Sequence, residues 1–143
     1  MITFDSILVP VDGSENSKRA LGYAIDLARR YSAKLTIIHV VPLATAIVTG
    51  PEVLAVDVSR QLEESGKNIL SSAIEVVKNA GLEACSRMVQ GRPGNEIVEV
   101  AKEEGIDLIV IGRRGLGAVA RFFLGSVTDH VVHNAPCPVM IVK

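Results

Sequence analysis

Short apolar runs of strand length alternate with amphipathic helical patterns along the whole chain. Strands are predicted at residues 6–12, 34–41, 82–89, 107–112 and 138–143. A helical pattern with apolar positions at 21, 24, 25 and 28 follows the first strand, and further helices are predicted at residues 59–80, 93–105 and 126–134. A crossover through a helix returns the chain in its original direction, so this order predicts five parallel strands with helices on both faces. The fold class expected is α/β, as one domain spanning residues 1–143.

The composition fits such a sheet. Apolar residues make up 48% of the chain and aromatic residues only 3%, so the core has to be built from Val, Ile, Leu and Ala. Fifteen basic and 16 acidic residues leave a net charge of -1, which gives no overall attraction to nucleic acid or to an anionic membrane. No apolar stretch approaches the roughly 18 residues of a membrane span.

Two cysteines, far apart, predict neither a disulfide framework nor a zinc site. The first residues lack the pattern of a signal peptide. We therefore expect a cytoplasmic protein. Residues 43–58 are mostly apolar but are interrupted by Gly50 and Pro51, so we expect a flexible or lid-like connection there.

The segment GRRGLGAVARFFLGSV, residues 112–127, predicts a phosphate site. Gly112 and Gly115 follow the fourth strand, and Gly125 with Ser126 opens the last helix. Glycine lets a ligand approach the backbone, and a helix N-terminus offers unpaired N–H groups to an anion. The alternative is purely structural: a turn at Gly112, a hinge at Gly125, and a capping box that begins at Ser126.

Other phosphate-site motifs do not match. No Gly-Lys-Ser/Thr of a Walker loop follows the first strand, and the GxGxxA-like run at 115–120 follows the fourth strand instead of the first. Asp12 alone would also suit a phosphoacceptor receiver domain. The third strand ends in Met-Val-Gln at 88–90, which lacks the Asp that such a domain phosphorylates.

Histidine and cysteine give weak signals. His130 and His133 share a helix face, but no third metal ligand is visible beside them. His39 lies inside an apolar strand, which indicates a hydrogen-bonded core residue. Nothing near Cys137 in the sequence marks it as an activated thiol.

The spacing Gly112, two residues, Gly115, nine residues, Gly125-Ser126 resembles the G-2x-G-9x-G-[S/T] signature of the ATP-binding branch of the universal stress protein family. The opening ILVPVDGSENSKRAL, the strand DLIVIG and the ending GSVTDHVVHNAPCPVMIV are also similar to that family. The resemblance covers most of the chain, residues 43–58 excepted.

This resemblance implies an open sheet of order 3-2-1-4-5, Rossmann-like and similar to the adenine nucleotide alpha hydrolases, with ATP as the ligand. The adenosine part would be met by Pro10, Val11 and Asp12, and the adenine edge by the backbone of Val40 or Val41. The phosphates would be held by Gly112, Arg113, Gly115, Gly125, Ser126 and Val127. Mg²⁺ or Mn²⁺ would be bound through the phosphates, because no carboxylate cluster suggests a protein metal site.

Arg113 stands where family members often have a small hydroxyl residue. Its guanidinium would either pair with a phosphate or crowd the site. No catalytic base is evident, which favours a nucleotide-binding regulatory module in the stress response, with slow or absent hydrolysis. A slow ATPase or phosphotransferase and a nucleotide-free dimeric scaffold remain alternatives. The apolar run in residues 138–143 would be an edge strand that needs a partner. The resemblance implies a homodimer through this strand, and the alternative is an edge covered by the chain itself. A regulatory protein partner is expected but unknown.

Overall fold

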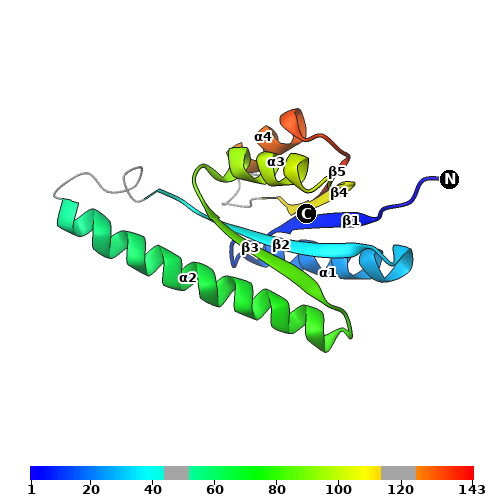
Figure 1. Cartoon of the computed structure of the whole chain (residues 1–143), viewed down its shortest axis with the longest axis horizontal. Coiled ribbons are helices and arrows are strands. Elements are labelled where there is room, and N and C mark those ends of the chain that lie inside the picture. Colours follow the sequence, from blue (N-terminus) through cyan, green and yellow to red (C-terminus); the bar gives the residue numbers. More distant parts are fainter. Residues whose placement is uncertain (44–51, 114–124) are drawn as a thin grey trace.

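The computed structural model describes residues 1–43, 52–113 and 125–143, and it shows one parallel sheet of order β3-β2-β1-β4-β5 (Figure 1). The elements in chain order are β1 (Ser6–Pro10), α1 (Glu15–Tyr31), β2 (Lys34–Val41), α2 (Glu52–Asn79), β3 (Ala84–Gln90), α3 (Pro93–Glu103), β4 (Leu108–Gly112), α4 (Ser126–Asn134) and β5 (Val139–Val142). The expected fold class and strand order are confirmed.

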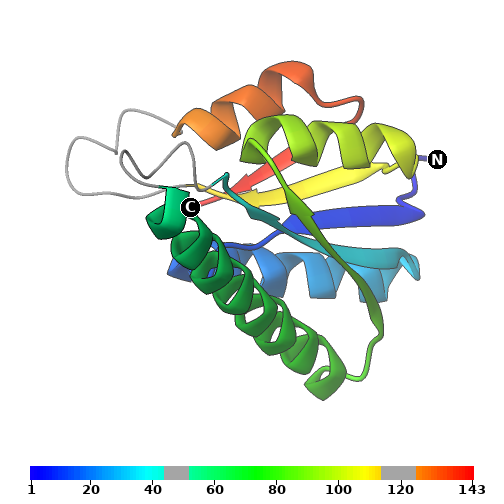
Figure 2. The same ribbon diagram turned by 60° about the vertical axis from the view of Figure 1, so that its left-hand side comes forward.

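Helices cover both faces of the sheet. Figures 1 and 2 show α1 and α2 on one face and α3 and α4 on the other. Successive strand residues point to opposite faces, so the β1 side chains divide between two cores. Ile7 and Val9 pack toward α1 and α2, while Leu8 packs toward α3 and α4. All three are fully buried.

The β1–α1 connection is a tight turn, which brings the start of α1 to the end of the first strand. Gly13 has a φ of 83°, a conformation that residues with a Cβ rarely adopt. Ser14 is the N-cap of α1, and its Oγ accepts a hydrogen bond from the Ser17 N–H at 3.2 Å.

The predicted loop at 43–58 is partly wrong. The helix α2 begins at Glu52, seven residues before the expected start, and is 28 residues long. The valines at 53, 56 and 58 lower helix propensity only slightly, and Pro51 directly precedes the first helical turn, where a missing N–H is tolerated. Residues 44–51 of the predicted loop lie outside the described part of the chain.

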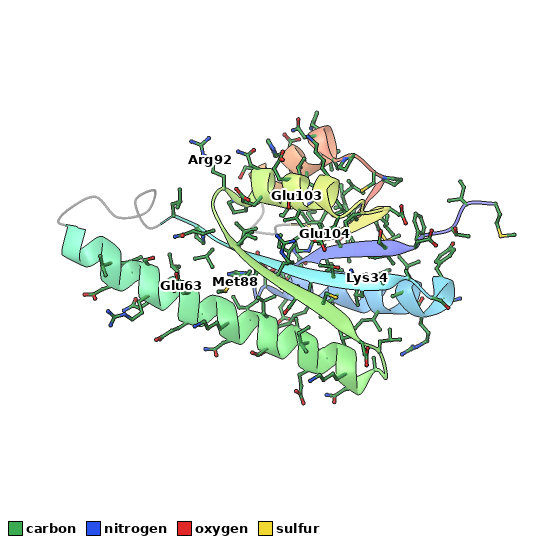
Figure 3. All side chains as sticks on the ribbon, viewed as in Figure 1. Lys34, Glu63, Met88, Arg92, Glu103 and Glu104 are labelled. Atoms are coloured by element: carbon green, nitrogen blue, oxygen red, sulfur yellow. The ribbon has the colours of Figure 1, made fainter. Side chains whose placement is uncertain are left out.

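The centre of α2 packs closely on the sheet. Gly66 is buried, and a Cβ on it would lie 2.8 Å from Cδ2 of His39 on β2 and 3.2 Å from the sulfur of Met88 on β3. Met88 lies beside α2 in Figure 3. None of the helices in the described ranges is long and apolar enough to span a bilayer.

Candidate functional site

A cavity of about 330 Å³ opens at the carboxyl ends of β1, β2 and β4. The strand order reverses between β1 and β4, and ligands of open α/β sheets bind at such a switch point. The described residues that line it are Pro10, Val11, Asp12, Ser14, Ser17, Ile38, His39, Val40, Pro42, Pro93, Ile97, Ile111, Gly112, Arg113, Val127 and Thr128.

Three helices begin at the wall of this cavity. Ser14 and Ser17 belong to the start of α1, Pro93 is the first residue of α3, and Val127 and Thr128 lie in the first turn of α4. The first N–H groups of a helix have no partner within the helix, and its dipole is positive at that end. The cavity therefore offers an electropositive backbone environment that suits an anionic ligand.

Asp12 lies two residues after β1 and is held in place by the turn. Its Oδ1 accepts a hydrogen bond from the Ser14 N–H at 2.9 Å. Its own N–H lies 3.4 Å from Oγ of Ser17, and that hydroxyl donates to the Ser14 carbonyl at 3.0 Å. The exposed carboxylate therefore keeps a fixed place on the cavity wall.

At the end of β2, the backbone groups of Val40 and Val41 face opposite sides of the strand. The register of β1 with β2 ends at Pro10 opposite Ile38, and the Val11 N–H donates to the Ile38 carbonyl at 2.8 Å. Peptide groups two residues apart on a strand face the same neighbour, so the polar groups of Val40 face the space beyond the end of β1. The Val41 carbonyl, by contrast, accepts from the Gly91 N–H on the β3 side. Of the two, Val40 lines the cavity.

Gly112 and Arg113 form the exit from β4. A Cβ on Gly112 would lie 2.5 Å from the carbonyl oxygen of Asn16 and 2.9 Å from the Ser17 nitrogen. From the sequence, we expected a ligand to approach the backbone closely at this glycine. In the structure, the first turn of α1 makes that close approach. The Arg113 N–H donates to the Val142 carbonyl at 2.7 Å, which extends the pairing with β5 by one residue.

The start of α4 does not form the capping box that was the structural alternative for Ser126. Gly125, with a φ of 83°, is the N-cap residue, and no side-chain hydrogen bond caps the helix. The structural alternative for Ser126 is therefore wrong, because Ser126 is the first helical residue and is exposed. Val127 lines the cavity. Gly115 lies outside the described residues.

Sequence reasoning missed several wall residues, chiefly Ser17, Pro93 and Thr128. The helix start at Pro93 was visible in the sequence, but its position at the cavity wall depends on the packing of α3. His39 was expected to be a hydrogen-bonded core residue, which is confirmed: it is buried, with Nδ1 2.8 Å from the Val11 carbonyl oxygen.

The remaining candidates do not join this site. His133 Nδ1 lies 2.8 Å from the Asp129 carbonyl oxygen of its own helix. Burial, with a smaller contribution from the charge of Asp107, raises the pKa of the Cys137 thiol, which opposes activation. Within the described ranges, no group of three or more His, Cys, Asp or Glu side chains is placed to hold a metal ion.

A second cavity, of about 390 Å³, lies between α1 and α2. Its wall combines apolar side chains such as Leu21 and Ile69 with Lys18, Ser65 and Asn68. Val11 and Ser17 border both cavities. The second cavity is therefore a rival location for a small ligand.

The profile of the universal stress protein family matches residues 3–143. The chain belongs to the universal stress protein family. Universal stress protein YxiE of Bacillus subtilis is 36% identical over 147 residues, covering 98% of this chain and 99% of the relative. Universal stress protein MJ0531 of Methanocaldococcus jannaschii is 35% identical, covering 98% of this chain and 82% of the relative.

Solved universal stress proteins have the same fold. UspA from Lactobacillus plantarum superimposes with a TM-score of 0.87 at 28% identity, over 100% of both chains. A universal stress protein in complex with cAMP has a TM-score of 0.71 at 30% identity, over 99% of this chain and 98% of the other. The Archaeoglobus fulgidus protein in complex with dAMP has a TM-score of 0.73 at 27% identity, over 100% of both chains.

Proposed function

We propose that this universal stress protein binds ATP in the cavity at the ends of β1, β2 and β4. The observation that carries the proposal is that three helix starts and the carboxylate of Asp12 share one cavity. Backbone N–H groups suit phosphates, and a carboxylate suits the hydroxyls of a ribose or the adenine amino group. Family members in complex with cAMP and with dAMP support an adenine nucleotide as the ligand.

In this binding mode the adenosine part lies against Pro10, Val11 and Asp12. The backbone of Val40 meets the adenine edge. The phosphates extend toward the glycine-rich segment and the start of α4, where Gly112, Arg113, Gly115, Gly125, Ser126 and Val127 hold them. Mg²⁺ or Mn²⁺ accompanies ATP through phosphate oxygens and water.

We assign the protein a regulatory role with slow or absent hydrolysis. Fast phosphoryl transfer needs a group that positions or deprotonates the attacking water. Asp12 lies at the proposed sugar end, and His39 directs Nδ1 at the Val11 carbonyl. Bound ATP would instead favour one conformation or partner over another. The reducing cytoplasm, our proposed location, suits the two free cysteines.

The valine variant of Gly125 tests nucleotide binding against a matched control. Gly125 and Gly81 have φ values of 83° and 81°, so a valine strains the backbone at both, but Gly81 lies between α2 and the start of β3, at the opposite edge of the sheet from the cavity. We expect Gly125→Val to weaken ATP binding at least ~10-fold and Gly81→Val to leave it within about twofold. Isothermal titration calorimetry measures both.

Chromatography of nucleotide released from the denatured wild-type protein complements the titration. Retention of adenine nucleotide by wild type and Gly81→Val, but not by Gly125→Val, is the expected result. A wild-type protein that neither carries nor binds an adenine nucleotide contradicts the proposal.

We also propose a homodimer through residues 138–143. The described sheet has two edge strands, β3 and β5. The β3 edge carries the charged Arg87, paired with Glu104 at 3.2 Å beside the end of α3, where Figure 3 labels Glu103 and Glu104. The β5 strand, Val-Met-Ile-Val, has no charged residue and leaves Val139, Met140 and Ile141 partly exposed. Uncharged edges favour pairing with another strand.

A charged residue on each edge separates the two possibilities. We expect Ile141→Lys to give a monomer in sedimentation velocity, whereas wild type and the β3 variant Ser86→Lys sediment as dimers. Monomeric wild-type protein, or a dimer lost only with Ser86→Lys, would exclude the β5 interface.

A further inference from the structure

Three backbone carbonyl groups at the cavity each receive a hydrogen bond from a side chain of another element. The Val11 carbonyl is 2.8 Å from Nδ1 of His39, which must carry the proton because a carbonyl only accepts. The Gly112 carbonyl accepts from Oγ1 of Thr128 at 3.3 Å. The Arg113 carbonyl accepts from Nδ2 of Asn16. The donors come from β2, α4 and α1.

The two contacts at the β4 exit differ from the third because they act on adjacent residues, Gly112 and Arg113. Thr128 is 2% exposed and lies in the first turn of α4, and Asn16 is partly buried in the first turn of α1. With the Arg113 N–H bound to β5, the backbone of residues 112 and 113 is held from three sides. Both side chains contact this backbone through polar groups and not through apolar packing.

Carbonyl oxygens carry partial negative charge and would repel a phosphate group. A side-chain donor that engages such an oxygen fixes its direction and offsets part of its charge. The electropositive helix starts would then attract the phosphates, and these two carbonyl groups would repel them less. This matters at β4, where the phosphates are placed, and not at the adenosine end.

We propose that Asn16 and Thr128 are positioning residues for the phosphate end of the nucleotide site. They act through the carbonyls of Arg113 and Gly112 and need not touch the ligand themselves. The proposal rests on the proposed nucleotide binding and extends it: the two residues govern the affinity for the triphosphate and leave the affinity for the nucleoside unchanged.

The test compares ATP with adenosine by isothermal titration calorimetry of the full chain. Thr128→Val and Asn16→Leu keep the approximate size of each side chain and remove its donor. We expect each to weaken ATP binding about 10-fold and to change adenosine binding by less than about twofold. Thr128→Ser, which keeps the hydroxyl, should restore ATP binding to within about twofold of wild type.

Asn79→Leu, at the exposed last residue of α2 and outside the walls of both cavities, is the control for an Asn-to-Leu change and should alter neither affinity. Equal weakening of ATP and adenosine would show a merely structural role and overturn the inference, as would unchanged ATP binding. Should Asn16→Leu fail to fold, the pair Thr128→Val and Thr128→Ser decides. A wild type that binds neither ligand contradicts the proposed function and this inference together. If the wild type binds ATP but the variants do not weaken ATP binding more than adenosine binding, the inference alone is contradicted.

Discussion

Replacing Gly112 by alanine is expected to lower the free energy of unfolding by about 3 kcal/mol, an effect at the upper end of overpacking. The added Cβ would lie 2.5 Å from the carbonyl oxygen and 2.6 Å from the carbonyl carbon of Asn16. Both atoms are backbone of α1, so the contact cannot be relieved by rotating a side chain. The helix has to move away from β4, which separates buried residues of their shared core.

Gly22→Ala is the matched control for this substitution. Gly22 lies on the exposed face of α1, and a Cβ there meets no atom within 4 Å. Because alanine favours the helix, this variant should gain up to about 1 kcal/mol. Urea unfolding of the three proteins measures both changes. A loss below about 1 kcal/mol for Gly112→Ala would show that α1 does not depend on this close approach.

Replacing Asp12 by alanine is expected to weaken the binding of ATP and of adenosine alike, by about 10- to 100-fold, the range for hydrogen bonds to a charged group. The carboxylate lies on the cavity wall, and its Oδ1 is fixed by the Ser14 N–H at 2.9 Å. In the proposed mode it meets the adenosine part, which both ligands share. Calorimetric titration with each ligand measures the effect.

Asp26→Ala is the control for the loss of a carboxylate. Asp26 lies on the exposed side of α1 and pairs with Arg30 at 2.8 Å. The pair is exposed, so its removal should change the affinity for either ligand by less than about twofold. Affinity unchanged in Asp12→Ala, or lost for ATP alone, would contradict the place given to the adenosine part.

The fold was predictable because local patterns decide it. Apolar runs buried on both faces and amphipathic helices leave few arrangements for a chain of this size. The start of α2 was missed because the Gly50-Pro51 pair was taken to interrupt any regular element, whereas a proline at the start of a helix is tolerated. The resemblance implied that Asp12 and Gly112 belong to one site, and both line the cavity, at the exits of the neighbouring strands β1 and β4.

The finer structure of the site depends on contacts that sequence patterns do not show. Asn16 meets Arg113 across 97 positions of the chain, and His39 meets Val11 across 28. The same holds for Gly112, whose missing side chain makes room for α1. Local sequence indicated that a close backbone approach occurs at this glycine, but only the packing of α1 on β4 identifies the partner.

A crystal structure of the protein grown with ATP tests the central claim most directly. The account predicts adenine beside the backbone of Val40, ribose at Asp12 and phosphates at the start of α4, within the cavity of about 330 Å³. ATP bound instead in the cavity between α1 and α2, or no bound nucleotide at millimolar ATP, would contradict it.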